Sequence, residues 1–246
     1  MRNVLLVARR ELQAYVTTLL GYIIGCAVLW ADGMLFNWYV LTGGPQLSTR
    51  VLEGFFYIAA GTTMIASIFL SMRLLAEERQ TGSLVLLMTS PVREWEIVLG
   101  KFLSALAFLG GITLLSVYMP LLIFVNGRVS VGHIISGYLG LMLLGGASLA
   151  IGLLGSALGA AVPRFRVVTA LVASSVMMLF MLLAWKGSEV SEPPLDQLFQ
   201  YLALYNKHFV PFQSGIVGLS HVLYYLSVMF LFLLASTKVL EARRWR

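Results

Sequence analysis

Apolar residues fill six long stretches of the chain, and short polar segments separate them. The stretches cover residues 16–37, 55–75, 97–125, 133–162, 166–186 and 217–240. A membrane-spanning helix needs roughly 20 mostly apolar residues to cross a hydrocarbon core of about 30 Å. The pattern therefore predicts an all-α integral membrane protein with six transmembrane helices. Pro120 lies inside the third stretch and predicts a kink there.

A separate helix is expected before the first span. An apolar residue recurs every three or four positions, at Leu5, Ala8, Leu12 and Tyr15. Arg2, Arg9 and Gln13 occupy another face. This spacing predicts an amphipathic helix over residues 1–15 that lies along the cytoplasmic interface, with Arg2, Arg9 and Arg10 near anionic lipid headgroups. The alternative is a polar extension of the first span.

Composition and charge agree with a membrane protein. The chain is 59% hydrophobic and 11% charged, whereas soluble domains carry about 25% charged residues. Thirteen of the 17 Lys and Arg residues fall in loops on the side of the N-terminus, and four fall on the other side, at Arg50, Arg128, Lys186 and Lys207. Such a bias marks cytoplasmic loops. We therefore expect a multi-pass protein of the inner membrane with both termini in the cytoplasm, and we ascribe the net charge of +6 to this bias rather than to nucleic-acid binding.

The chain lacks the common motifs of catalytic and nucleotide-binding sites. It has no P-loop, no H-E-x-x-H zinc motif and no G-x-S-x-G elbow. Its three histidines are scattered along the sequence, which predicts no metal site, and Cys26 is expected to serve packing. Asp32 is an acidic residue inside a span, and it is expected to reach the outer interface rather than to bind a substrate. The chain is therefore expected not to be an enzyme.

Residues 76–96 enclose a short apolar run, 84–88, within the most polar loop. The charged residues are Glu77, Glu78 and Arg79 before the run and Arg93, Glu94 and Glu96 after it. Gly82 permits a turn, Ser83 can cap a short helix over the apolar run, and Pro91 suits the first position of the next helix. The apolar run either docks into a groove of a soluble partner or dips into lipid, and composition favours neither.

The stretch EERQTGSLVLLMTSPVREWEIVLGK, residues 77–101, resembles the segment between the second and third spans in permease subunits of ABC-2 type exporters. The positions that match are Glu77, Glu78, Arg79, Gly82, Ser83, Leu84, Leu86, Leu87, Ser90, Pro91, Glu96, Ile97, Val98, Gly100 and Lys101. Two positions depart from the pattern. Val85 replaces the usual acidic residue, and Arg93 stands where a Ser or Thr cap is common.

The resemblance implies a mechanism and a set of partners. Two permease chains, identical or different, would pair in the lipid membrane, and each would receive one of two soluble ATPase subunits. ATP and Mg²⁺ would bind to the ATPases, and the permease itself would carry no cofactor. The coupling residues implied by the match are Glu77, Glu78, Arg79, Gly82, Ser83, Leu84, Leu86, Leu87, Met88, Pro91 and Arg93.

The likeness extends to the branch that contains the gliding-motility permeases and the permease for nitrous-oxide-reductase maturation. The outer loop 187–216 matches that branch at Asn206, His208, Phe209 and Phe212, although Lys207 splits the usual Asn-His pair. The loop is expected to carry a short surface helix, and an extracytoplasmic accessory protein is a further possible partner.

Three functions are compatible with these features. The first is export of a lipid, peptide, polysaccharide or sulfur-containing species, driven by ATP. The second is a machine that uses ATP to act mechanically on outer partners without carrying a solute. The third is an ATP-independent channel or small-molecule carrier, although the lack of intramembrane charge pairs counts against a proton- or ion-coupled carrier.

Overall fold

The computed structural model describes residues 2–38, 47–81, 93–126, 129–159, 166–190 and 203–242, with only the backbone given for 2, 76–81, 126, 166–167, 180–182 and 184–190. Over these ranges the chain is helical and contains no β-strand. The helices are α1 (Arg2–Thr17), α2 (Leu19–Phe36), α3 (Ser48–Thr81), α5 (Glu94–Leu115), α6 (Tyr118–Asn126), α7 (Val131–Gly159), α8 (Arg166–Val190), α10 (Val210–Gln213) and α11 (Leu219–Glu241).

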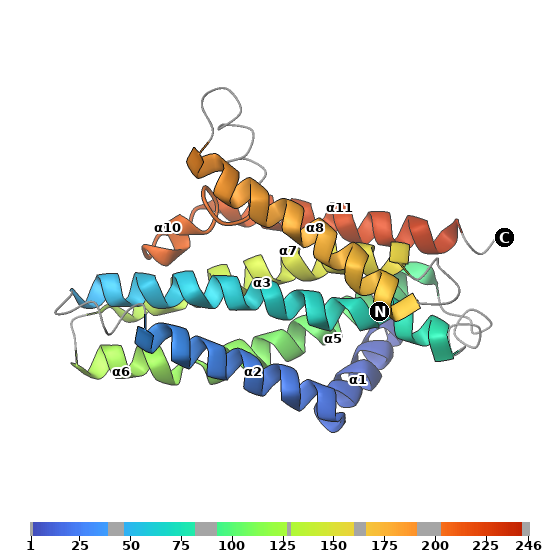
Figure 1. Ribbon diagram of the computed structural model, residues 1–246, viewed down its shortest axis with the longest axis horizontal. Coiled ribbons are helices and arrows are strands. Elements are labelled where there is room, and N and C mark those ends of the chain that lie inside the picture. Colours follow the sequence, from blue (N-terminus) through green and yellow to red (C-terminus); the bar gives the residue numbers. More distant parts are fainter. Residues whose placement is uncertain are drawn as a thin grey trace.

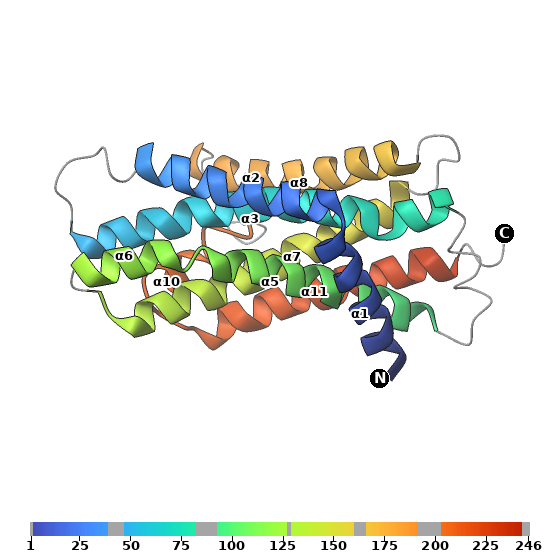
Figure 2. The ribbon, with the colours of Figure 1, turned by 90° about the horizontal axis from the view of Figure 1, so that it is seen from below.

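The long helices form a bundle. The helices α2, α3, α7, α8 and α11 and the α5–α6 pair run along the longest axis of the molecule (Figures 1 and 2). Both ends of the chain lie toward one end of the bundle, together with the C-terminal end of α3 and the N-terminal end of α5 (Figure 1). We call this the terminal end. The opposite end, where α6 finishes and α10 lies, is the distal end.

The predicted all-α membrane architecture is confirmed. Five apolar helical stretches are long enough to cross a membrane, namely Leu19–Phe36, Ser48–Leu75, Glu94–Val125, Val131–Gly159 and Leu219–Glu241. In α8, which covers the remaining predicted span, the described apolar stretch is shorter, at Val168–Leu179. The second span begins at Ser48 rather than near residue 55, because the first helical turns of α3, which carry Arg50 and Glu53, extend it toward the distal end.

The helix α7 forms the centre of the bundle. Most of its residues are buried, and it contacts α3, α5, α8, α10 and α11. Small residues along α7 allow this close approach, since a Cβ on Gly155 would lie 2.6 Å from the Cα of Ser174, and one on Gly159 would lie 2.2 Å from the Cα of Ala170. Helices in membranes associate largely through such packing of small residues. These two glycines thus allow α7 to pack closely against α8.

Side-chain hydroxyls add polar links between the packed helices. Ser156 of α7 donates to the carbonyl of Met72 at 3.0 Å, and Ser174 of α8 donates to the carbonyl of Gly152 at 2.9 Å. These hydroxyls are shielded from water, so each finds an acceptor on a neighbouring helix rather than staying unsatisfied. The bonds fix the register of α3 and α8 against α7.

The third span is broken near the kink predicted at Pro120. The helix α5 ends at Leu115, a turn covers residues 116 and 117, and α6 begins at Tyr118. Proline has no N–H to donate to the carbonyl of Ser116, and its ring clashes with that carbonyl in a regular helix. The Ser116 carbonyl instead accepts from the backbone N–H of Met119 at 3.1 Å.

Candidate coupling site between α3 and α5

The segment predicted to contact an ATPase joins α3 to α5 at the terminal end of the bundle. Glu77, Glu78 and Arg79 continue the backbone of α3 in its last turns. The other predicted coupling residues that precede Arg93 lie outside the described residues, namely Gly82, Ser83, Leu84, Leu86, Leu87, Met88 and Pro91. The described part of the site is therefore the frame next to this segment in the chain, formed by the first turns of α5 and by α1.

The start of α5 is fixed by a carboxylate. Arg93 lies just before the helix with an extended backbone, and its N–H donates to Oε2 of Glu96 at 3.0 Å. The N–H groups at a helix start have no acceptor within the helix. The third residue of the helix can satisfy one of them when its side chain accepts from the N–H of the capping residue. The amide of Asn3 also donates to Glu96, at 3.3 and 3.4 Å. Glu96 thus joins the start of α5 to α1.

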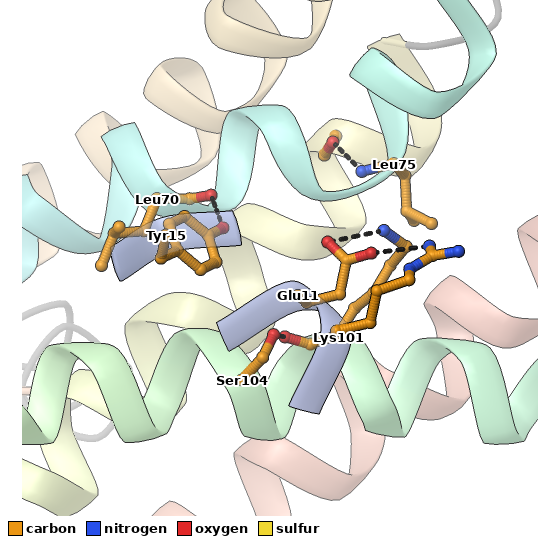
Figure 3. Close-up of polar contacts among 8 residues, drawn as sticks. Glu11, Tyr15, Leu70, Leu75, Lys101 and Ser104 are labelled. Atoms are coloured by element: carbon orange, nitrogen blue, oxygen red, sulfur yellow. Dashed lines mark hydrogen bonds and ion pairs between the residues drawn. The ribbon is translucent and has the colours of Figure 1, made fainter. Parts of the chain in front are cut away.

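A buried ion pair joins the same two helices one turn further along. Nζ of Lys101 on α5 lies 3.3 Å from Oε2 of Glu11 on α1, and the Lys101 side chain is only 1% exposed. Arg10 donates to the other carboxylate oxygen at 2.8 Å. Figure 3 shows a dashed line from each oxygen of the Glu11 carboxylate to a cationic side chain, one of which is Lys101. Burial raises the pKa of the Glu11 carboxyl, but the positive charges of Lys101 and Arg10 outweigh this effect and hold the pKa below its usual value.

Backbone contact brings the two helices close at this point. A Cβ on Gly100 would lie 2.8 Å from the side chain of Val7 and 3.0 Å from the carbonyl oxygen of Val4. At the other end of α1, the hydroxyl of Tyr15 donates to the carbonyl of Leu70 on α3 at 3.1 Å (Figure 3). The helix α1 is therefore attached to both helices that flank the predicted coupling segment.

The structure corrects the predicted faces of α1. The most buried side chains are those of Val4 and Tyr15, and Glu11 is partly buried beside Lys101, whereas Leu5, expected on the apolar face, is 66% exposed. Arg9 and Arg10 are exposed, as an interfacial helix requires. At Thr18 the backbone is extended, which ends α1 before α2 begins, so α1 is a separate helix and not an extension of the first span.

The sequence that forms this frame matches a known family of proteins. The family model described as ABC-2 family transporter protein matches residues 11–242. The chain belongs to the ABC-2 family. The ABC-2 chain is thus a membrane permease component of an ABC transporter, and the family works with an ABC ATPase. No curated protein matches the ABC-2 chain.

Residues of the outer loop that were singled out in the sequence hold the distal end of the ABC-2 chain together. His208 is 7% exposed and stacks on Tyr224 of α11 with ring centres 3.5 Å apart. Phe209 and Phe212 are fully buried, and Ser136 of α7 donates to the carbonyl of Phe212 at 3.1 Å. Asn206 lies in the turn before them and is partly buried. The three ring-bearing residues therefore pack against α7 and α11 rather than forming an exposed surface.

Two polar contacts were missed at the sequence level. Asp32 is buried within the bundle: it is 4% exposed and accepts a 2.6 Å hydrogen bond from the hydroxyl of Thr62. Two of the histidines also meet, with Nδ1 of His208 and Nδ1 of His221 3.4 Å apart. The apolar patterns of α2 and α3 do not reveal that Thr62 faces Asp32. The two histidines are thirteen residues apart, and this spacing gave no signal because a turn separates them. Within the described residues no group of three or more potential metal ligands is formed.

Proposed function

We propose that the chain is the permease of an ATP-driven exporter and that residues 77–94 are the contact for its ATPase. In this proposal two permease chains pair and each binds one ATPase subunit. The carboxylates of Glu77 and Glu78 face basic groups of the ATPase, and the leucines between 84 and 88 fill a cleft in it. Closure of the ATPases on ATP moves the segment, and the segment moves α3 and α5.

The observation that supports this proposal is the frame around the segment. The segment connects α3 and α5 in the chain, and the ends of these two helices that it connects lie at the terminal end (Figure 1). The first turns of α5 are held to α1 by Glu96 and by the Lys101–Glu11 pair. Because these contacts hold the first turns of α5, we expect a movement of the segment to displace α5 as a whole rather than to bend its first turns.

Replacing two leucines of the segment tests the ATPase contact. The variant Leu86→Asp/Leu87→Asp puts two charges where an apolar cleft is expected, and a charge buried without a partner is strongly unfavourable. We expect loss of ATPase co-purification while the permease stays folded in detergent. The matched control is Val217→Asp, which adds a charge at the opposite end of the bundle at a 54% exposed position. Full ATPase yield with the double variant would refute the proposal.

Export and mechanical transmission share this contact and differ in what ATP accomplishes. Membership of the ABC-2 family favours an ATP-driven function over a channel or carrier that works without ATP. Proteoliposomes that contain the permease and its ATPase separate the remaining two. ATP-dependent movement of a solute or lipid supports export, whereas ATP-dependent structural change without any movement supports mechanical transmission.

A further inference from the structure

A groove runs along the outside of the bundle between α2 and α3. Two cavities of about 610 and 370 Å³ make it up, and both are lined by Leu35, Thr62 and Ile65. Because the cavities share these three residues, they adjoin, and we treat them as one groove on the surface of the bundle. The first cavity extends toward the distal end, and the second extends toward the terminal end.

The groove changes from polar to apolar along its length. At the distal end it is lined by Arg50, Glu53 and Gln213. Toward the terminal end, apart from Thr62, its lining is apolar and includes Ile23, Ala27 and Phe69. The Thr62 hydroxyl already donates to Asp32 and so is engaged within the chain. A ligand that matches this gradient has a charged group at one end and a hydrocarbon body.

The charges at the distal end specify the polar part of such a ligand. Arg50 and Glu53 lie one helical turn apart on α3, so they fall on the same face. A guanidinium binds phosphate through paired hydrogen bonds, and a carboxylate pairs with an ammonium group. Opposite charges at this spacing complement a headgroup that carries both a phosphate and an amine.

The length of the groove fits one lipid molecule. Twelve residues separate Arg50 from Thr62, which corresponds to about 18 Å along a helix. One leaflet supplies about half of a hydrocarbon core of about 30 Å. A lipid with its headgroup at Arg50 and Glu53 therefore places its acyl chain along the groove to the level of Thr62 and Ile65.

We propose that the groove between α2 and α3 binds a phospholipid with a zwitterionic, phosphoethanolamine-type headgroup. Arg50 contacts the phosphate, Glu53 contacts the ammonium, and the apolar half of the groove holds an acyl chain. The lipid belongs to the leaflet at the distal end of the bundle. This site does not depend on the proposed ATPase contact, since none of its residues lies in the segment 77–94.

The test measures lipid retention by the purified permease with native mass spectrometry. The probes are phosphatidylethanolamine and phosphatidylglycerol in equal amounts. We expect wild-type protein to retain phosphatidylethanolamine preferentially, and Arg50→Met to lower retention of both lipids about tenfold, the effect of one lost charged hydrogen bond. We expect Glu53→Gln to remove only the preference for phosphatidylethanolamine. The matched control is Lys207→Met, which removes an exposed cation at the same end and leaves retention unchanged.

Two further arms separate the alternatives. Ala27→Trp fills the apolar part of the groove and is expected to abolish retention, whereas Leu226→Trp on the exposed face of α11 is not. Glycerophosphoethanolamine, the same headgroup without acyl chains, is expected not to displace the lipid. Equal retention by Arg50→Met, Glu53→Gln and wild type would overturn the proposal, even if Ala27→Trp failed to fold. Loss of permease pairing in Ala27→Trp with lipid retention unchanged would also overturn it and assign the groove to a second copy of the chain.

Discussion

The ion pair between Glu11 and Lys101 allows a quantitative test of how α1 is held. Replacing Glu11 by Gln keeps the shape of the side chain but removes the negative charge next to the Lys101 ammonium, which is 1% exposed. At the observed 3.3 Å and an effective dielectric constant of about 20, the lost attraction is about 5 kcal/mol. Removing one partner of a buried pair costs about 3–5 kcal/mol in practice. Because the Glu11 side chain is 17% exposed and water reaches this site, we expect the lower value, about 3 kcal/mol.

Hydrogen exchange of the amides in residues 2–17 measures this cost directly. The pair holds α1 against α5, so its loss lowers the free energy needed to open α1 locally. A change of about 3 kcal/mol corresponds to roughly a hundredfold faster exchange, at 1.4 kcal/mol for each factor of ten. Amides of α7, which lies at the centre of the bundle, should exchange as slowly as in the wild type.

Two comparisons make this reasoning refutable. Lys238 and Glu241 form a pair at 2.7 Å on α11 with side chains 67% and 41% exposed, and such surface pairs contribute below about 1 kcal/mol. The control Glu241→Gln should therefore leave exchange nearly unchanged. The double variant Glu11→Gln/Lys101→Met also removes the buried Lys101 ammonium and should recover most of the loss. If Glu11→Gln and Glu241→Gln have equal effects, the ion pair does not hold α1.

Three further predictions concern packing, a buried hydrogen bond and pH. Gly159→Ala places a Cβ 2.2 Å from the Cα of Ala170, so α7 and α8 must separate, and we expect thermal unfolding to show a loss of about 1–3 kcal/mol. Tyr225→Phe removes the 2.6 Å bond to the Leu204 carbonyl and leaves that buried acceptor unsatisfied, which should cost about 1–3 kcal/mol in the same assay. The pKa of Glu11 is lowered in the folded protein, so its ion pair stabilises α1 at neutral pH and is lost as the pH falls below the ordinary value of 4.5. The stability difference between wild type and Glu11→Gln should therefore shrink below that pH.

The membrane architecture could be predicted because it depends on the length and composition of segments. A span must hide its backbone polar groups in a helix and present apolar side chains to lipid, so it leaves a long apolar stretch in the sequence. The break near Pro120 was predictable for a similar reason, since proline cannot donate the hydrogen bond that a helix needs. Neither prediction requires knowledge of which helices are neighbours.

Contacts between helices could not be predicted in the same way. The apolar spacing of α1 suggested Leu5 as part of its packed face, yet the packed face is set by Gly100, which admits Val4 and Val7 of α1. An acidic residue such as Glu11 does not look like part of a packed face until its partner is known. The sequence separation between Glu11 and Lys101 hides that partner, because only the fold brings the two residues together.

The positions of α1 contacts suggest how movement at the coupling segment reaches the membrane. Glu96 and Lys101 attach α1 to the base of α5, and Tyr15 attaches it to α3 at Leu70. Thr18 is the single residue between α1 and α2. A displacement of α5 at its base therefore carries α1 with it, and the short connection passes the displacement to α2. Since α2 forms one wall of the groove that faces α3, the same movement changes the width of the groove. We therefore expect lipid binding in the groove and ATPase binding at the proposed coupling segment to be linked through α1, each changing the affinity of the other by the same factor.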